Sequence, residues 1–385
     1  MPYPIRYLLF VFSIFVAAGL GSCRMEDQPD FRMATFQCDV TPPEGTPIYS
    51  GYEPLAEVEH PLLAKGIVID SGIERYVLCV IDWCEICNST HTLFKEVLAE
   101  ASGTDISRVA VRTVHQHTAP MGDARAMRIL DTLENPPPHP DPGLFEDAAF
   151  KVAEALKGAL SDMHLVDRIG TGQSRVEKVA ATRRVKDEDG SILVRWSRCS
   201  DPELRAMPEG RIDPYLKTIT FAGGDRPLAR LHFYATHPQS FYGDPRASYD
   251  FPGMARQKME EEEGVFQLYF TGCAGDVTAG KYNDGSPEAR EQLAARLYEG
   301  MRRSAESTSF RDIDEIDWRT TEVNLPLNKS GDRNPEALRA RMVDSGLPHS
   351  SRVGAAMSLS TLDREDKPYI LSALRVNDSW IVNLP

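Results

Sequence analysis

The chain has 385 residues, of which 42% are hydrophobic and 26% are charged, and its formal net charge is −14. These values are typical of a globular protein and exclude wholesale disorder and fibrous repeats. The acidic balance argues against nucleic acid as a partner, because nucleic-acid-binding domains carry a basic surface. The length allows one large domain or two ordinary ones, and either can bury a sizeable core.

The N-terminal segment has the pattern of an export signal. Arg6 precedes an apolar run from Leu8 to Leu20, which is too short for a membrane span and typical of a signal sequence. Two small residues, Gly21-Ser22, stand directly before Cys23, and this arrangement resembles a bacterial lipobox, in which the cysteine receives the lipid. The alternative is an ordinary signal peptide cut nearby, but the position of the cysteine favours the lipoprotein.

These features predict three parts of unequal size. We expect a signal peptide over residues 1–22, a tether over 23–33 and one folded domain over 34–385. No second apolar stretch in the sequence approaches membrane length. The predicted product is therefore an exported lipoprotein of the cell envelope, periplasmic or on the surface, that contacts the membrane only through its N-terminal lipid. We find no internal repeat and no long linker in the sequence.

Strands and helices are predicted to alternate along the chain. β-Branched and alternating runs indicate strands, and apolar residues at helical spacing indicate helices. In chain order we expect two strands within 66–82, a helix at 90–101 ended by Gly103, a strand at 109–114, a helix at 144–163, strands at 192–196, 216–221 and 228–235, a helix at 250–263, a strand at 265–270, a helix at 287–305, and strands at 318–327, 368–376 and 380–384. This alternation predicts an α/β or α+β fold.

Two further segments have local signals of their own. Residues 119–143 are rich in proline and show little periodicity, so we expect a long loop, which could shape the mouth of a pocket. Cys84 and Cys87 form a single C-x-x-C. A structural zinc site would need a second pair, so we interpret these two cysteines as structural, with a disulfide possible after export.

Histidines at two predicted strand ends are candidate metal ligands. His115 and His117 close the strand at 109–114, and residues two apart in a strand point to the same face. His237 follows another strand and precedes Pro238, which forces the chain out of the sheet. Neutral imidazole suits zinc, so the sequence predicts a zinc site if folding brings these strand ends together. The alternative is that His115 and His117 are ordinary polar residues at a loop entrance.

A glycine-rich segment after the strand at 265–270 is the third candidate. It runs from Thr271 to Thr278 and contains Asp276. Small residues let the backbone approach a ligand closely, so Asp276 and Thr278 could place a carboxylate and a hydroxyl beside the imidazoles. Taken alone, the segment is better interpreted as a glycine-rich turn with a capping aspartate.

Together these segments resemble one family, the neutral/alkaline (non-lysosomal) ceramidases, specifically their N-terminal catalytic domain. The similarity begins near residue 34 and follows the order of the family's motifs. It is carried by Asp39–Pro43, Thr113–Pro120, Thr182–Arg184, Asp213–Pro214, Ala235–Pro238, Asp250–Gly253 and Gly275–Ala279. The resemblance implies mixed β-sheets packed together with helices outside, in a single catalytic domain, and a bacterial lipoprotein-type member of the family.

The resemblance also implies a zinc amidase that cleaves an N-acyl lipid such as ceramide, with metal-activated water as the nucleophile. One zinc ion would be bound by His115 and His237. A glutamate and a tyrosine, both expected beyond Pro385, would complete the ligands, so we expect the chain to be truncated at its C-terminus. The remaining site residues implied by the resemblance are His117 as a proton carrier or substrate contact, Arg183 near the substrate, Thr278 at the position of the family's active-site serine, and Asp276 as its neighbouring acid.

Departures from the family pattern keep other functions open. Thr278 replaces serine, Ala279 replaces proline and Thr182 replaces asparagine. The threonine methyl narrows the site and fixes its rotamer, which bears on the substrate more than on the metal. The alternatives are a hydrolase of the same fold that acts on a different amide, ester or glycan-linked substrate, an inactive surface-anchored binding protein, and, last, a phosphoesterase.

Overall fold

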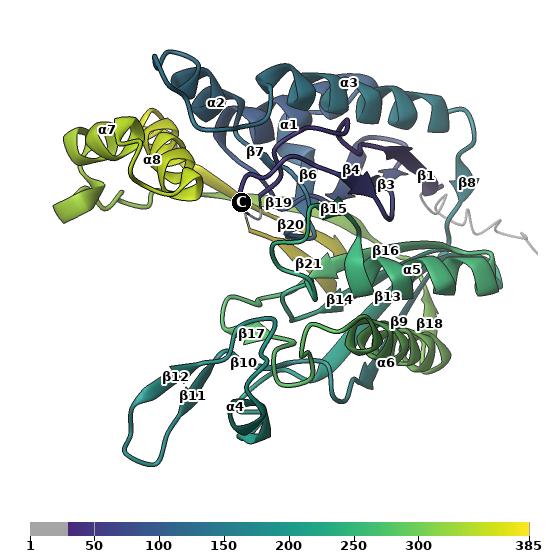
Figure 1. Ribbon diagram of the computed structural model, residues 1–385. Helices are drawn as coiled ribbons and strands as arrows, with labels where there is room; N and C mark the ends of the chain where they lie inside the picture. The colour runs from purple at the N-terminus through teal and green to yellow at the C-terminus, as the bar shows by residue number, and fades with distance from the viewer. Residues whose placement is uncertain (1–29, 50, 385) are drawn as a thin grey trace, which may run out of the picture.

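The computed structural model describes residues 30–49 and 51–384. The predicted signal peptide and Cys23 lie outside the described residues. Two five-stranded mixed sheets dominate the architecture, and helices cover them on the outside (Figure 1). The predicted fold class, a single α+β domain of mixed sheets with outer helices, is confirmed. No helix of the described part of the chain is long and apolar enough to cross a membrane.

The two large sheets have the same strand pattern. In each, three antiparallel strands are followed by a fourth that is parallel to the third. In spatial order the first sheet contains β6 (Val109–Thr113), β4 (Arg75–Ile81), β3 (Leu63–Asp70), β1 (Arg32–Asp39) and β8 (His164–Leu165). The second contains β16 (Phe266–Thr271), β14 (Arg226–Tyr234), β13 (Tyr215–Gly223), β9 (Arg168–Arg175) and β18 (Ser309–Asp312). The repeat lies in the topology and has no counterpart in the sequence.

Helices connect the parallel strands and cover the outer faces. A parallel pair needs a crossover, usually a helix, and α1 (Asn88–Ser102) joins β4 to β6 as α5 (Asp250–Glu263) joins β14 to β16. α3 (Pro142–Ala159) packs on β1, and α6 (Pro287–Glu306) packs on β9 and β13. The remaining helices are α2 (Ala124–Leu130), α4 (Pro202–Ala206), α7 (Pro335–Val343) and α8 (His349–Leu362).

Smaller sheets complete the domain. A three-stranded antiparallel sheet contains β19 (Ile316–Val323), β20 (Tyr369–Val376) and β21 (Ser379–Asn383). The two-stranded pairs are β2 (Glu57–Val58) with β15 (Arg246–Ala247), β5 (Glu85–Ile86) with β7 (Met121–Gly122), β10 (Ala181–Thr182) with β17 (Val277–Thr278), and β11 (Arg184–Lys186) with β12 (Ile192–Val194). The last pair forms a hairpin that projects from the molecule (Figure 1).

The ends of the parallel strands of both sheets meet at one place. β16 contacts both β4 and β6. The hydroxyl of Thr271, the last residue of β16, donates to the carbonyl oxygen of Val114 just beyond β6, at 2.6 Å. Arg256 of α5 and Asp82, directly after β4, form a buried two-bond ion pair with both distances 2.8 Å. These contacts fix the segments that follow β4, β6, β14 and β16 next to one another.

Most predicted elements are confirmed, and one prediction is wrong. Gly103 ends α1 with φ +67°, a conformation that glycine adopts without strain. The segment 119–143, predicted as a loop, contains β7 and α2. Asp123 caps α2 by accepting from the amide of Ala126 at 3.1 Å, and α2 packs on α8. This packing partner lies more than 200 residues away, so local periodicity could not reveal it.

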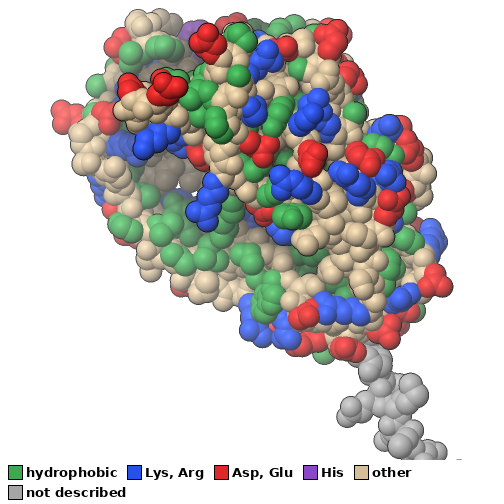
Figure 2. Space-filling view, turned by 90° about the horizontal axis from the view of Figure 1, so that it is seen from below, with side chains coloured by type: hydrophobic (Ala, Val, Ile, Leu, Met, Phe, Trp, Pro, Cys, Tyr) green, Lys and Arg blue, Asp and Glu red, His purple; other side chains and the backbone are tan. Residues whose placement is uncertain are grey.

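The charge of the surface is mixed. On the face seen from below, Lys and Arg side chains are interspersed with Asp and Glu side chains, and hydrophobic side chains gather toward the lower left (Figure 2). This pattern agrees with an acidic composition of 57 Asp and Glu against 43 Lys and Arg.

Candidate metal centre

The structure brings the three predicted histidines into one cluster. The ring centroids of His115 and His117 are 4.7 Å apart, those of His115 and His237 are 5.1 Å apart, and those of His117 and His237 are 5.8 Å apart. His117 and His237 are buried, and the His115 side chain is 31% exposed. Residues separated by 120 positions in the sequence therefore face one another at the junction of the two sheets.

The backbone around His115 differs from the predicted extended strand. β6 ends at Thr113, and His115 has φ +72°, in the left-handed region that a non-glycine residue adopts only when contacts hold it there. The amides of His115 and Gln116 both donate to the carbonyl oxygen of Trp83 at 3.1 Å. The buried Gln116 side chain donates to the carbonyl of Pro238 at 3.2 Å, which ties the loop after β6 to the loop that carries His237.

The orientation of His237 is set by a backbone carbonyl. Its Nδ1 lies 2.8 Å from the carbonyl oxygen of Ala274, and a carbonyl can only accept, so we assign the ring proton to Nδ1. The lone pair is then on Nε2. An imidazole held through one nitrogen by a carbonyl, with the other free to ligate, is the usual arrangement of a metal-binding histidine.

Arg183 faces the ring of His237. Its Nη2 lies 2.9 Å from Nε2 and 3.2 Å from Nδ1, so the guanidinium nitrogen lies against the ring and off the axis of the Nε2 lone pair. The Arg183 amide donates to the carbonyl of Asp276 at 2.6 Å, and the guanidinium stacks over the exposed ring of Trp196 with its carbon 5.2 Å from the ring centre. A fixed positive charge is therefore present at the edge of the cluster.

The imidazoles of His117 and His237 are neutral near pH 7. Burial, together with the neighbouring His115, lowers the pKa of His117 to about 2. Burial and the Arg183 guanidinium lower the pKa of His237 to about 4. Neutral imidazole is the form that ligates a metal or accepts a proton.

Asp276 and Thr278 lie on the adjoining glycine-rich segment, with different surroundings. The Asp276 carboxylate is 45% exposed and pairs with Arg184. Thr278 is fully buried in β17, and its hydroxyl donates to the carbonyl oxygens of Arg195 and Trp196 at 3.3 and 3.5 Å. The Thr278 hydroxyl therefore holds the backbone at Trp196, whose ring stacks with the Arg183 guanidinium.

Sequence reasoning missed one residue of the cluster, Cys84. Ligand atoms of Cys84, His115 and His117 all lie within 4.8 Å of one another. Cys84 Sγ is 3.9 Å from His115 Nδ1, and the same nitrogen lies 3.0 Å from the Cys84 carbonyl oxygen. Cys84 and Cys87 are both free thiols, so the disulfide considered from their spacing is not formed. The missed signal was the position of Cys84 directly after a buried strand.

The donor atoms present fit a zinc ion. Imidazole nitrogens and a thiol are the ligands that zinc prefers, in sets of three or four. Three rings and one sulfur converge here from separate loops, with one ring oriented by a carbonyl on its far side. Hard cations such as Mg²⁺ and Ca²⁺ instead require oxygen ligands, and the ligand group found in the described residues contains none.

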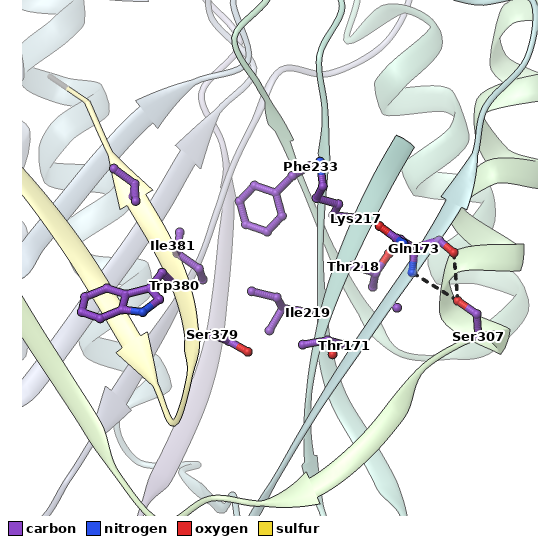
Figure 3. A pocket seen from close by; sticks show the side chains of 12 residues that line it. Thr171, Gln173, Lys217, Thr218, Ile219, Phe233, Ser307, Ser379, Trp380 and Ile381 are labelled. Carbon is purple, nitrogen blue, oxygen red and sulfur yellow. Dashed lines mark hydrogen bonds between the residues drawn. The ribbon is translucent and has the colours of Figure 1, made fainter. Parts of the chain in front are cut away.

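A separate cavity lies away from the histidines. It has a volume of about 640 Å³ and is lined by residues of β9, β13, β14 and β21, among them Lys217, Ile219, Phe233 and Trp380 (Figure 3). None of the three histidines lines it. The side chains that could ligate a metal gather at the histidine cluster and not at this cavity, so we place the candidate site at the histidines.

Comparison with solved structures finds this fold in neutral ceramidases. The crystal structure of neutral ceramidase from Pseudomonas aeruginosa matches with a TM-score of 0.65 and 15% identity, over 92% of this chain and 62% of that one. A ceramidase complexed with C2 matches with a TM-score of 0.63 and 14% identity, over 92% of this chain and 63% of that one. The chain thus spans less than two thirds of the length of these structures. No family model and no curated protein matches the sequence. At this level of identity the likeness shows a shared fold.

Proposed function

We propose that the protein is a zinc-dependent hydrolase that cleaves the amide bond of an N-acyl lipid such as ceramide. The observation that carries the proposal is the convergence of His115, His117 and His237 in a fold shared with neutral ceramidases. The ligands proposed from the sequence, His115 and His237, belong to this cluster. The glutamate and tyrosine ligands implied by the family resemblance remain part of the proposal.

The side chains around the cluster have complementary chemical roles in this proposal. When bound, Zn²⁺ supplies a Lewis acid that lowers the pKa of a coordinated water toward ~7. Arg183 presents a guanidinium that can donate to the carbonyl oxygen of the amide as negative charge develops on it. His117, whose ring centroid lies 4.7 Å from that of His115, is the side chain that carries a proton to the leaving amine in this proposal.

Asp276 and Thr278 contribute through neighbouring groups. The Asp276 carbonyl accepts the Arg183 amide, and its carboxylate neutralises Arg184, so it positions the guanidinium that faces the substrate. The Thr278 hydroxyl holds the backbone at Arg195 and Trp196. In the proposed site, Thr278 takes the place of the family's serine, and turnover by a Thr278→Ser variant tests how far the methyl group sets the choice of substrate.

Aromatic side chains give the site an apolar rim suited to a lipid-like substrate. The ring centroid of Tyr49 is 4.9 Å from that of His117, and the ring centroid of Tyr242 is 5.8 Å from it. Tyr242 and Trp196 are 50% and 61% exposed. Burial of apolar substrate surface against such rings is favourable at roughly 25 cal/mol per Å².

Export and lipid anchoring are also part of the proposal. The apolar run Leu8 to Leu20 and the adjacent Cys23 support an envelope lipoprotein. Metabolic labelling with a fatty acid should label the wild-type protein and not the Cys23→Ser variant. Equal labelling of the two would refute the anchor.

The amidase proposal is tested by metal content and turnover measured together. We expect near-stoichiometric zinc in the purified chain and hydrolysis of a fluorogenic N-acyl amide. Both should be lost in the His115→Ala, His237→Ala double variant. A matched control is His164→Ala, which removes an imidazole that is 46% exposed in β8 and should keep zinc and turnover.

Two results would contradict the proposal. Zinc-loaded protein that fails to cleave amides of any acyl length would refute the amidase while leaving the metal site. A purified chain that binds no zinc would refute the metal site itself.

A further inference from the structure

Cys84 and His237 occupy equivalent places in the two halves of the fold. β4 and β14 are corresponding strands in sheets of the same topology. Cys84 follows the last residue of β4 by three positions, and His237 follows the last residue of β14 by three positions. The segment after β4 thus brings a thiol to the junction where the segment after β14 brings an imidazole.

The surroundings of Cys84 differ from those of a cysteine that only fills space. A buried cysteine is ordinarily a small hydrophobic residue, and Cys79 of β4 is one, because it lies within a hydrophobic core cluster. Cys84 is equally buried but belongs to neither core cluster. Its sulfur instead lies 3.9 Å from Nδ1 of His115.

The spacing of the donor atoms is close to that of a zinc site. Zn–S and Zn–N bonds of about 2.3 and 2.0–2.1 Å at tetrahedral angles put neighbouring ligand atoms about 3.5 Å apart. The ligand atoms of Cys84, His115 and His117 lie within 4.8 Å of one another. Side-chain movements of about 1 Å would therefore bring the sulfur of Cys84 and a ring nitrogen of His115 to one ion.

We propose that Cys84 is a thiolate ligand of the metal at the histidine cluster, beside His115. The inference rests on the proposed metal site and adds a sulfur donor to it. On binding, the thiol loses its proton to solvent as the metal–sulfur bond forms, and no electrons are transferred. A soft donor favours Zn²⁺, Co²⁺ and Cd²⁺ over Mg²⁺, Ca²⁺ and Mn²⁺, so the site selects its metal by ligand type.

Cobalt substitution tests this inference without reference to turnover. A cysteine thiolate bound to Co²⁺ gives an intense near-ultraviolet charge-transfer band, which imidazole and carboxylate ligands do not give. We expect this band in the cobalt-loaded, reduced protein. It should vanish in Cys84→Ser, with an affinity for cobalt lower by at least about tenfold, since even residues outside the ligand set contribute that much.

A neighbouring cysteine provides the matched control. Cys87 lies three residues further on, and its Sγ donates to the Glu85 carboxylate at 3.4 Å. Cys87→Ser should therefore keep both the band and the affinity. If the Cys84→Ser variant fails to fold, Cys84→Ala takes its place. In either case the presence or absence of the band in the wild-type spectrum decides whether a thiolate binds the metal.

The outcomes separate this inference from the proposed function. Stoichiometric cobalt without the band would overturn the role of Cys84 and leave a metal site made of histidines. Loss of the band in Cys87→Ser, with retention in Cys84→Ser, would overturn it in favour of the other thiol. Failure of the wild-type chain to bind either cobalt or zinc would overturn the inference and the proposed metal site together.

Discussion

The proposed ligand role of His237 makes a prediction about Arg183. The guanidinium nitrogen Nη2 lies 2.9 Å from Nε2 of His237 and 3.2 Å from Nδ1, and Nδ1 is engaged with the Ala274 carbonyl at 2.8 Å. Nε2 is therefore the ring nitrogen that can ligate. Zinc bound there would have the positive guanidinium beside it, so the arginine opposes metal binding. We predict that Arg183→Ala binds zinc more tightly than the wild type does.

The magnitude follows from the repulsion between the guanidinium and the metal. Two unit charges about 4 Å apart interact by about 1 kcal/mol in water and by about 4 kcal/mol near a protein surface. Arg183 is partly exposed, so a value near the lower limit applies. A difference of 1.4 kcal/mol corresponds to a factor of about ten in the dissociation constant. The expected zinc dissociation constant of Arg183→Ala is thus about tenfold lower than that of the wild type.

Zinc titration in competition with a chromogenic chelator measures this difference. Arg184→Ala is the matched control, because it removes the same charge from the neighbouring residue. The Arg184 side chain is 60% exposed and paired with Asp276. Its effect should not exceed about threefold, as for other surface charges. Equal effects of the two variants would attribute the change to net charge alone. Weaker zinc binding by Arg183→Ala would refute the idea that the Arg183 guanidinium opposes the metal at His237. Amide turnover should fall in Arg183→Ala while zinc binding tightens, because the donor to the substrate carbonyl is lost.

Three further predictions concern stability, each measured by urea unfolding. Arg256→Met leaves its buried carboxylate partner after β4 uncompensated and should lower the free energy of unfolding by about 3–5 kcal/mol; a loss below 1 kcal/mol would contradict the importance of this pair. Burial lowers the pKa of His232 to about 4, below the unfolded value of about 6.5, so the unfolded state binds more protons between these values and stability falls as the pH drops through this range. His232→Gln should therefore lose about 2 kcal/mol less than the wild type between pH 7 and pH 5, and equal losses would exclude this histidine as the cause. Gly280→Ala should cost about 3 kcal/mol or prevent folding, because its Cβ would overlap the carbonyl oxygen of Trp196, whereas Gly275→Ala, with open space around it, should be tolerated.

The sequence predicted the local elements well where a single strand or helix carries its own pattern. The apolar runs at 109–114 and 228–235 became β6 and β14, and the helix at 250–263 became α5. α7 and α8 were not predicted. The sequence of α8 is rich in serine and also contains threonine and glycine, whose helical preference is weak, and its stability comes from packing on α2 and α7. Tertiary contacts of that kind leave no periodic signal in a single sequence.

The candidate site shows a different limit. Residue chemistry and strand ends were enough to select His115, His117 and His237, although the extended geometry assumed for the first two was wrong. Their actual geometry depends on two amides that share the carbonyl of Trp83, a contact with the segment after another strand. Cys84 was interpreted as structural because a structural zinc site would need a second C-x-x-C pair, and the sequence has none. Only the parallel pairing of β4 with β6 shows that the residues after both strands share one edge of the sheet.

The repeated topology explains why a metal would bind where the two halves of the fold meet. The first half contributes Cys84, His115 and His117, and the second contributes His237, with Arg183 beside it from the segment after β10. Cys84 and the three histidines each follow a strand of a parallel pair, and the carboxyl ends of parallel strands are where such folds gather their ligands. A metal held by ligands from both halves links segments more than 100 residues apart. Its binding free energy then adds to the stability of the packed halves, because an unfolded chain cannot hold these ligands together. Metal binding and the docking of the two sheets should accordingly be coupled, with zinc raising the midpoint of unfolding in the wild type and leaving the His115→Ala, His237→Ala variant unchanged.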